Sequence, residues 1–491
     1  MEHRLVEPLI ESGEQKYLGR LRTYRFFQEY LGECCPDLPM KLVPIPLYNL
    51  PPSFGWDFVE KNKLEWVIDS TDDEGIVTQF LRSHLPDVVK KGLESFLRSR
   101  IPGPLVLEGI FAGEDMGFTP PIGLFNNVYV MDADASIRER VHRLEQAIKS
   151  IWAKVFVSQS KKFMMNLELP VEDWMLTVAL SVPQAPRRGS FYYPDITCAV
   201  MGGMGMRSRG FVAGGWWEPS HPHFPTPVPF TPGDPVGYST ANLLALEAKG
   251  GIGTLTRISS HLAKTHGTMN LPVIQPGEKV ADKSSRHSVM EGEGAPFSQL
   301  TAQLIENVSA MLGEPVTLHL SLQPNSYTGE YEVFLNSVRT VIPKKIPMIM
   351  PKPLKHNVDY IFDTIPARGD GSGFARYIIE IDKDPSEETM ESIHRYLNIL
   401  TCEGESAIII APQFCNTEKL TDLGSHYSVL GVCSPECVER LPHRLFQINV
   451  PFTLKNMDSM LIMQSMKGTL IRVSAKPIKI VVEKGLATAW L

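Results

Sequence analysis

The chain has 491 residues, of which 43% are hydrophobic and 21% are charged, an ordinary balance for a globular protein with a sizeable core. Its formal net charge of −7 argues against broad electrostatic attraction to nucleic acid or to an anionic membrane. The N-terminus lacks a basic start followed by an apolar run, and no apolar run approaches the ~20 residues that span a bilayer. We therefore expect a cytoplasmic protein with neither nucleic-acid nor membrane partners.

The seven cysteines favour reduced thiols over a disulfide framework, because an odd number in a long chain leaves at least one unpaired. Cys433 and Cys437, with Cys415 nearby, are also compatible with zinc. Their spacing differs from CxxC, and no fourth ligand stands beside them. Reduced structural thiols are the preferred interpretation.

Apolar spacing and turn residues predict alternating helices and strands through the first 340 residues. The clearest helix starts after Ser136, because Ser136 and Glu139 have the spacing of a capping box. Residues 201–237 are rich in glycine and proline and are expected to form a long irregular segment. The other expected elements are helices at 16–31, at 76–99 with a break at Leu85-Pro86, and at 300–312, and strands at 104–107, 129–130, 174–182, 316–322 and 331–335.

The last third of the chain predicts a separate α/β domain over residues 358–491. Residues 341–357 are rich in proline and lysine and suit a linker. A βαβ unit follows, and the last fifty residues are expected to be short strands. These elements are a strand at 377–381, a helix at 386–400, a strand at 407–411, and strands at 446–450, 461–463, 469–473 and 478–482.

Several segments occur in the order and spacing of one enzyme family. Residues 18–23 (LGRLRT) resemble a G-G-K-A-R-G segment, and residues 103–115 (GPLVLEGIFAGED) resemble G-P-L-A-V-R-S-S-S-x-x-E-D. Later matches are at 147–156 (AIKSIWAKVF), 191–199 (FYYPDITCA) and 313–320 (GEPVTLHL). Together, over residues 18 to about 340, the chain resembles the nucleotide-binding half of phosphoenolpyruvate synthase and pyruvate phosphate dikinase.

The resemblance implies a mixed α+β and α/β architecture with an ATP-grasp-like fold, in which two subdomains clamp ATP and Mg²⁺. It places one subdomain in residues 1–100 and the second, with a long Gly/Pro-rich insertion, in residues 101–340. The residues alone indicate no cofactor, so ATP with Mg²⁺ is an expectation from the resemblance.

The residues at the family's phosphate-binding positions are altered. Arg20 replaces the lysine of the first segment and keeps its charge but not its shape, and Arg22 follows it. Glu108 replaces the phosphate-binding arginine, which reverses the sign of the charge beside a triphosphate. A lost charge-assisted hydrogen bond costs about 1.5–3 kcal/mol. Glu114 and Asp115 are retained, and we expect them to shape the loop.

The adenine and metal positions are altered too. Ser181 falls where the family has the acid of a Gln-Glu pair, so the acceptor for the base or sugar is missing. His319 falls on a metal-binding glutamate, and Asn336 lies near a conserved glutamine of the family's motif. Because Mg²⁺ prefers oxygen ligands, imidazole is a poor replacement. The ATP site is therefore expected to be eroded.

Three further patterns have competing interpretations. The loop Gly202-Gly203-Met204-Gly205, beside Arg207 and Arg209, is either an anion cradle or a turn. In the second pattern, His261 is either a phosphohistidine or a loop residue. In the third pattern, Glu218, His221 and His223 are either metal ligands or surface residues.

Three functional hypotheses follow. The first is a degenerate ATP-grasp protein that acts as a non-catalytic binding or scaffold protein. The second is a divergent but active ATP-dependent phosphotransferase that relies on other arginines. The third is a structural subunit of a larger assembly, with a protein partner on the 201–237 segment or the C-terminal domain. The apolar residues 211–217 are either a buried plug or a partner-binding patch.

Overall fold

The structure is a computed structural model. The chain divides into two compact units. Unit 1 comprises Met1–Lys161 and Pro170–Pro343, and unit 2 comprises Lys162–Leu169 and Lys344–Leu491. Both mix helices with sheets, so the expected mixed α+β class is correct. Among the helices described, none has the length and apolar character needed to cross a membrane. The structure describes residues 6–8, 21, 24, 30, 35, 37–45, 47–99, 103–116, 119–131, 135–182, 185–221, 224–225, 227–234, 237–238, 242–247, 251–253, 255–259, 287–288, 294–324, 330–340, 359–369, 371–381, 385–411, 423, 429–433, 446–448, 454–466 and 469–491.

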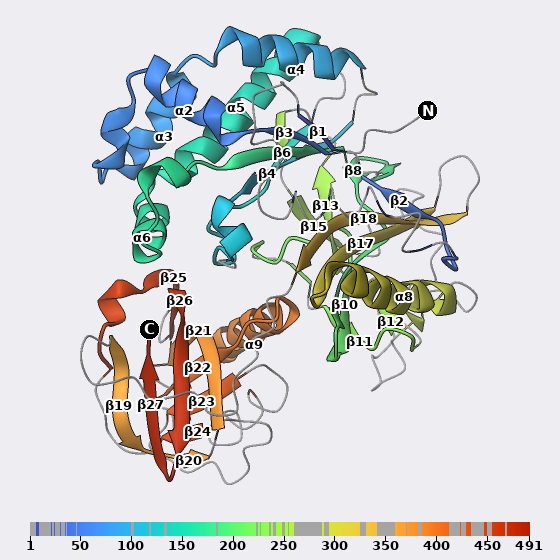
Figure 1. The fold of residues 1–491 in the computed structure, drawn as a ribbon. Helices are drawn as coiled ribbons and strands as arrows, with labels where there is room; N and C mark the ends of the chain where they lie inside the picture. The colour runs from blue at the N-terminus through green and yellow to red at the C-terminus, as the bar shows by residue number, and fades with distance from the viewer. Residues whose placement is uncertain are drawn as a thin grey trace. The chain divides into compact units, whose positions relative to one another are not determined.

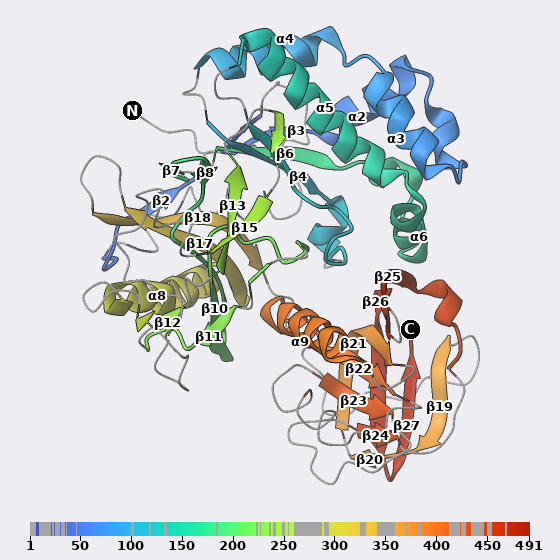
Figure 2. The ribbon, with the colours of Figure 1, turned by 180° about the vertical axis from the view of Figure 1, so that it is seen from behind.

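The first sheet of unit 1 is covered by helices on one face (Figure 1; Figure 2 shows it from behind). Tyr48 packs edge-on against Phe96 at 4.6 Å, and Gly109 leaves room for Ile151 and Leu176. The strands, in spatial order, are β1 (Val6–Pro8), β3 (Leu47–Leu50), β6 (Thr177–Ser181), β4 (Leu105–Ile110), β5 (Val128–Met131) and β14 (Gly251–Gly253). The helices of this part of the chain are α2 (Pro52–Lys61), α3 (Asp73–Arg82), α4 (Asp87–Ser99) and α5 (Ile137–Val155), with short 3-10 turns at Glu65–Ile68, Ala112–Met116 and Val171–Asp173.

Local signals determine where these helices begin and end. The predicted break at Leu85-Pro86 is correct, because α3 ends at Arg82 and α4 begins at Asp87. The capping box of α5 is also confirmed. The Ser136 side chain accepts from the Glu139 N–H, and the Glu139 carboxylate accepts from the Ser136 N–H at 2.8 Å.

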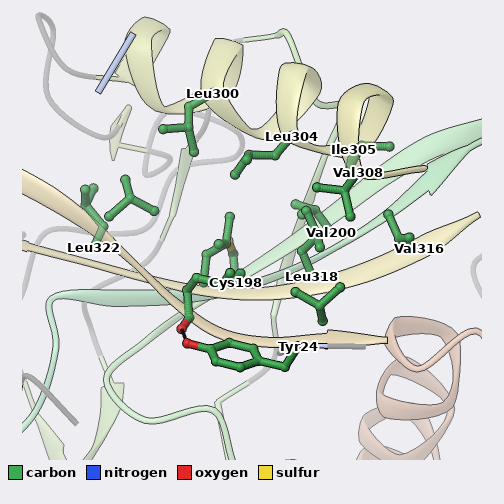
Figure 3. Close-up of a cluster of buried hydrophobic side chains, with 14 of the residues drawn as sticks. Tyr24, Cys198, Val200, Leu300, Leu304, Ile305, Val308, Val316, Leu318 and Leu322 are labelled. Atoms are coloured by element: carbon green, nitrogen blue, oxygen red, sulfur yellow. Dashed lines mark hydrogen bonds between the residues drawn. The ribbon is translucent and has the colours of Figure 1, made fainter. Parts of the chain in front are cut away.

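Helix α8 (Gly294–Leu312) packs on one face of the second sheet (Figure 3). Leu300, Leu304 and Val308 of the helix meet alternate strand residues such as Cys198 and Leu318, as the two-residue period of a strand requires. Tyr24 closes this core, and its hydroxyl donates to the Ile45 carbonyl oxygen at 2.9 Å. The strands, in order, are β11 (Val228–Phe230), β10 (Met206–Gly214), β9 (Ile196–Gly203), β17 (Val316–Pro324), β18 (Tyr331–Thr340) and β2 (Leu42–Pro44).

The prediction that residues 201–237 form one irregular segment was partly wrong. The first part completes a β9–β10 hairpin, in which Val212 pairs with Cys198 and Gly214 with Ile196. Glycines at the turn obscured the strand pattern on both sides of it. A third sheet, β15 (Leu255–Ser259), β13 (Asn242–Glu247), β8 (Phe191–Tyr192) and β7 (Arg187–Arg188), and the pair β12 (Gly237–Tyr238) and β16 (His287–Ser288) complete the described part of unit 1.

The sheets of unit 1 do not follow the predicted division at residue 100. Strand β3 pairs with β6, and strand β2 pairs with β18, so strands from the first 50 residues join sheets formed by later ones. Burial and register decide which strands become neighbours in a sheet. A division of the chain at one residue therefore does not predict these pairings. The predicted linker at 341–357 lies outside the described residues.

Unit 2 contains the predicted βαβ element. Strand β21 (Gly371–Ile381) runs parallel to β22 (Ala407–Ile410), and α9 (Glu387–Cys402), capped by Ser386, connects them. Strands β19 (Tyr360–Pro366) and β20 (Arg368–Gly369) are separated only by Ala367, yet they pair with β27 and β24, at opposite ends of the sheet order. The sheet must therefore bend so that its first and last strands come together. The remaining elements are α6 (Ser158–Asn166), which crosses from unit 1 into unit 2, β23 (Val429–Cys433), β24 (Phe446–Ile448), a 3-10 turn at Met457–Ser459, β25 (Leu461–Met466), β26 (Thr469–Glu483) and β27 (Leu486–Trp490).

The two strands predicted at 469–473 and 478–482 form the single strand β26. Its pairing with β21 shifts between the Ala375–Ile478 and Tyr377–Val473 pairs, so the intervening residues form a bulge. Pro477 lies in that bulge, where the missing backbone N–H costs no ladder hydrogen bond.

Candidate functional site

Glu108 lies on the face of the first sheet that the helices leave uncovered. Tyr48 and Gly109 point to the helical side, and Glu108 alternates with Gly109 along β4. Its cross-strand partner is Ala179, and the neighbouring pair on the same face joins Val106 to Ser181. The Ser181 hydroxyl donates to the Val106 carbonyl oxygen at 3.4 Å. Two residues predicted from distant segments, Glu108 and Ser181, therefore share one face of one sheet.

The carboxylate of Glu218 lies against the same face. The Tyr129 hydroxyl donates to Glu218 Oε2 at 2.8 Å, and the Asn127 amide donates to that oxygen at 3.1 Å. The Ser220 hydroxyl donates to Glu218 Oε1 at 2.5 Å. Because Tyr129 pairs with Val106, this group stands beside Glu108. Two carboxylates thus approach each other on the face that the resemblance assigns to phosphate.

Burial is the main cause of the pKa shifts of Glu218 and of the residues around it. Loss of solvent raises the pKa of Glu218, and the nearby charge of Glu108 raises it further, whereas the hydrogen bonds from Ser220, Tyr129 and Asn127 act to lower it. Burial also raises the pKa of Tyr129 well above its ordinary value. Burial lowers the pKa of Lys154, while the charge of Glu218 acts to raise it.

Glu218 belongs to residues 215–221, which we call the tryptophan segment. Its first residue, Gly215, has a φ of +75°, and a Cβ there would lie 2.0 Å from the Leu244 carbonyl oxygen, so only glycine fits. The Trp216 N–H donates to that same oxygen at 3.0 Å. At the other end, the His221 ring lies 3.2 Å from the Leu255 carbonyl oxygen. Both ends of the segment are therefore attached to the third sheet.

The two tryptophans contact different sheets. The Trp216 ring packs edge-on against Tyr129 of the first sheet, with 5.7 Å between ring centroids. The Trp217 ring packs edge-on against His319 of the second sheet at 5.9 Å. Since Leu318 and Leu320 belong to the core under α8, His319 faces away from that helix. The tryptophan segment thus lies between the uncovered face of the first sheet and the far face of the second.

His319 is unsuited to the role of a magnesium ligand. Arg339 Nη2 lies 3.1 Å from His319 Nε2, and a guanidinium only donates hydrogen bonds, so Nε2 is the acceptor. The Nε2 nitrogen of this ring is therefore already engaged by a cation. Asn336 lies at a bulge in β18, between the Ser337–His319 and Leu335–Leu320 pairs, and its Oδ1 accepts from the Ser321 hydroxyl at 3.2 Å.

The structure describes fewer contacts of the other predicted site residues. Arg20 and Arg22 lie outside the described residues. Glu114 is partly buried in the 3-10 turn Ala112–Met116, and its N–H donates to the Phe111 carbonyl oxygen. Asp115 lies in the same turn, which follows strand β4.

Gly202 and Gly203 end strand β9, and Met204 and Gly205 form the tight turn of the β9–β10 hairpin. All four residues have positive φ, and a Cβ on Gly203 would collide with Ser309 of α8. These glycines are therefore explained by chain reversal and close packing. Arg207 and Arg209 are exposed on β10.

Three residues of the possible metal sites, Glu218, His221 and Cys433, lie among the described residues. Glu218 is bound by Tyr129, and the His221 ring meets a backbone carbonyl. Cys433 is buried, and burial raises the pKa of its thiol above the ordinary range. In the part of the chain that the structure describes, no three His, Cys, Asp or Glu side chains gather as a metal would require. His223, His261, Cys415 and Cys437 lie outside that part.

The described residues beside the position that the resemblance assigns to phosphate include two carboxylates, which suit a cation better than the phosphates of ATP. Glu108 and Glu218 would place two carboxylates against phosphate, and His319 is already bonded to Arg339. Sequence reasoning missed Tyr129, Asn127 and Lys154, since their contacts with Glu218 are long-range; Tyr129 lies 89 positions from Glu218. No protein-family model matches the chain, and no curated protein sequence matches it.

Proposed function

We propose that this chain is a non-catalytic protein of the phosphoenolpyruvate synthase and pyruvate phosphate dikinase type, with an ATP-grasp-like fold whose nucleotide cleft is filled by its own tryptophan segment. In this proposal it acts as a binding or scaffold protein and transfers no phosphate. The observation that carries it is the position of residues 215–221, bound to Tyr129 on one sheet and packed on His319 of the next.

The first support is steric. In an ATP-grasp fold, the nucleotide lies between two sheets, and here the Trp216 and Trp217 rings lie between two sheets. Only 9% of the Trp216 surface is exposed, and its indole N–H donates to the Tyr192 carbonyl oxygen at 2.8 Å. Removing such a side chain from its contacts costs about 3–5 kcal/mol. A nucleotide would have to supply at least that much binding energy before showing any net affinity.

The second support is electrostatic. The family's phosphate-binding arginine corresponds to Glu108, and the structure adds Glu218 beside it. Two carboxylates oppose a triphosphate in a partly dehydrated site, where charges interact more strongly than in water. The divergent-phosphotransferase hypothesis relies on Arg20, Arg22, Arg207 or Arg209 beside the phosphates. Of these, Arg207 and Arg209 are exposed on β10, and Arg20 and Arg22 lie outside the described residues.

This arrangement also bears on protein partners. The described part of the 201–237 segment is used for internal contacts, since Phe211, Trp216 and Phe224 are buried. These three side chains are therefore not free to bind a partner in this conformation, whereas Met204, Arg207 and Arg209 are exposed.

The test is an ATP turnover assay on the full chain with Mg²⁺, with the variant Arg20→Ala measured in parallel. We expect turnover at the background rate in both proteins. Turnover by the natural chain that the Arg20→Ala substitution abolishes would contradict the proposal, because that arginine replaces the family's phosphate-binding lysine.

A further inference from the structure

The first residues of β10 form an open edge of the second sheet. Strand β11 pairs with β10 over residues 210–212 only. It is followed by a turn, in which the Asp234 N–H donates to the Thr231 carbonyl oxygen at 2.9 Å. Among the described residues, positions 206–209 therefore have a strand neighbour on the β9 side alone. Backbone and side chains at such an edge are available to another chain.

The side chains at this edge alternate in exposure. Arg207 and Arg209 are exposed, whereas Met206 and Ser208 are half-buried. The two guanidinium groups thus stand two positions apart on the exposed side of the strand, about 6–7 Å along it. The pairing with β9 shifts between Met206 and Arg209, so this stretch contains a bulge. A bulge leaves few main-chain groups in register for a further strand, and the side chains must supply most of any binding there.

Neither of these arginines has an acidic partner among the described residues. Other arginines of the chain do pair with carboxylates, as Arg98 does with Glu94 and Arg472 with Glu380. Acidic side chains are not scarce, because the chain has 55 acidic and 48 basic residues. The donors of both guanidinium groups at the open edge are therefore available to a ligand from outside.

The hairpin holds this edge in a fixed position. Gly203, at the end of β9, lies so close to α8 that a Cβ there would be 2.1 Å from Ser309 Oγ. Met204, at the hairpin tip, is exposed and adds apolar surface beside the arginines. Because the strands are packed on the helix, little main-chain freedom is lost when a ligand binds.

These features fit carboxylates that are presented with the same spacing. A guanidinium group binds a carboxylate through two parallel hydrogen bonds. In an extended segment, every second side chain points to the same face, so acidic residues at alternate positions lie about 7 Å apart. The net charge of −7 opposes the attraction of a long polyanion such as nucleic acid, whereas a short acidic segment meets mainly the local pair of cations.

We propose that residues 206–209 of β10 dock an acidic segment of a partner protein, in extended conformation, whose carboxylates at alternate positions bind Arg207 and Arg209. The segment lies along the edge beyond the end of β11. The proposal rests on the proposed function in one respect, since it gives the class of partner that a binding or scaffold protein would hold. ATP turnover would contradict the proposed function and leave this surface as it is.

Fluorescence anisotropy of the full chain with a short labelled peptide tests the docking. The peptide alternates glutamate with threonine. One control peptide has glutamine in place of every glutamate, and a second has the same composition with its glutamates adjacent. We expect saturable binding of the alternating peptide, weaker binding of the second control and none of the glutamine peptide. Binding should weaken as salt rises from about 50 to about 200 mM, because exposed ion pairs are screened.

Variants of the two arginines locate the binding. Arg207→Gln and Arg209→Gln should each weaken binding about fivefold, the upper range for an exposed ion pair, and the double variant should abolish it. Arg209→Lys keeps the charge but not the paired hydrogen bonds, so its affinity should be intermediate. Arg138→Gln removes an exposed arginine of α5 and should bind like the natural chain. Unchanged thermal unfolding confirms that each variant is folded.

Several results would overturn the proposal. These are no saturable binding up to about 1 mM peptide, equal binding of the glutamine peptide, or full affinity in the double variant. Preferential binding of a single-stranded oligonucleotide at the same arginines would make nucleic acid the occupant instead. A dimer seen by light scattering in the natural chain and lost in the double variant would show that a second copy of the chain covers this edge.

Discussion

The hydroxyl group of Tyr129 donates a 2.8 Å hydrogen bond to Glu218, and this bond attaches the tryptophan segment to the first sheet. Tyr129 is in a strand of that sheet, whereas Glu218 follows the β9–β10 hairpin of the second sheet. The pair therefore connects two sheets through one carboxylate. It also places negative charge where the family resemblance expects phosphate.

Replacing Tyr129 with phenylalanine removes one of the three donors that Glu218 accepts from. We expect the free energy of unfolding to fall by about 1–3 kcal/mol, the cost of losing one hydrogen bond to a buried carboxyl group. Urea unfolding followed by circular dichroism measures this loss. Tyr192→Phe is the matched control, because it keeps the ring and the backbone carbonyl that accepts from Trp216. Equal losses in both variants would show that the bond to Glu218 contributes nothing specific.

Gly215 and Gly205 form a matched pair of glycines with positive φ. A Cβ on Gly215 would lie 2.0 Å from Leu244 O, whereas a Cβ on Gly205 meets no atom within 4 Å. We expect Gly205→Ala to cost about 1 kcal/mol, the conformational strain alone. Gly215→Ala should cost about 1–3 kcal/mol more, because the collision forces the backbone to shift. Thermal unfolding of the two variants compares them directly, and equal melting temperatures would contradict the close approach.

The buried ion pair of Arg188 and Asp195 is expected to matter more than any exposed pair. Their side chains are 8% and 4% exposed, Arg188 also stacks on the Tyr193 ring, and the Tyr331 hydroxyl donates to Asp195. Arg188→Met leaves a buried carboxylate without its cation, which costs about 3–5 kcal/mol.

The exposed pair of Arg98 and Glu94 provides the control for this ion pair. Arg98→Met should change stability by less than about 1 kcal/mol. Adding Asp195→Asn to Arg188→Met should recover part of the loss, since it removes the uncompensated charge. Urea unfolding of the three variants tests this, and a loss in Arg188→Met no larger than that in Arg98→Met would contradict the prediction.

The capping box of α5 predicts a pH-dependent contribution to stability. Ser136→Ala should cost about 1 kcal/mol at neutral pH. Hydrogen bonds from the Ser136 hydroxyl and backbone lower the pKa of Glu139, so its contribution is present above the ordinary glutamate pKa and is lost as the pH falls through the lowered value. The difference between Ser136→Ala and the natural chain should therefore shrink in acid, as urea unfolding at two pH values would show. A difference that grows in acid would contradict this interpretation.

Signals that operate over a few residues were predictable from the sequence. Ser136 and Glu139 marked the start of α5, and the apolar alternation of 316–322 marked β17. The break before α4 followed from Pro86 alone. The single strand β26 was divided in two because Pro477 interrupts its pattern.

Long-range relationships were not predictable from one sequence. Nothing near Tyr129 indicates that it meets Glu218, and nothing near Arg188 indicates its burial with Asp195. The glycines of the β9–β10 turn were considered as an anion cradle because glycine permits both a positive φ and close approach to a ligand. The partner that approaches Gly203 is Ser309 of α8, more than a hundred residues away.

Thermal unfolding of the natural chain with and without millimolar Mg·ATP tests the central claim most directly. A ligand present at 100 times its dissociation constant adds about 2.7 kcal/mol of stability. For a chain of this size, that is a rise of a few degrees, roughly. We predict no shift with ATP, ADP or AMP, because in the proposed function the tryptophan segment and the carboxylates of Glu108 and Glu218 take the place of the nucleotide. A clear rise in the unfolding temperature with Mg·ATP would contradict the account and favour an active phosphotransferase.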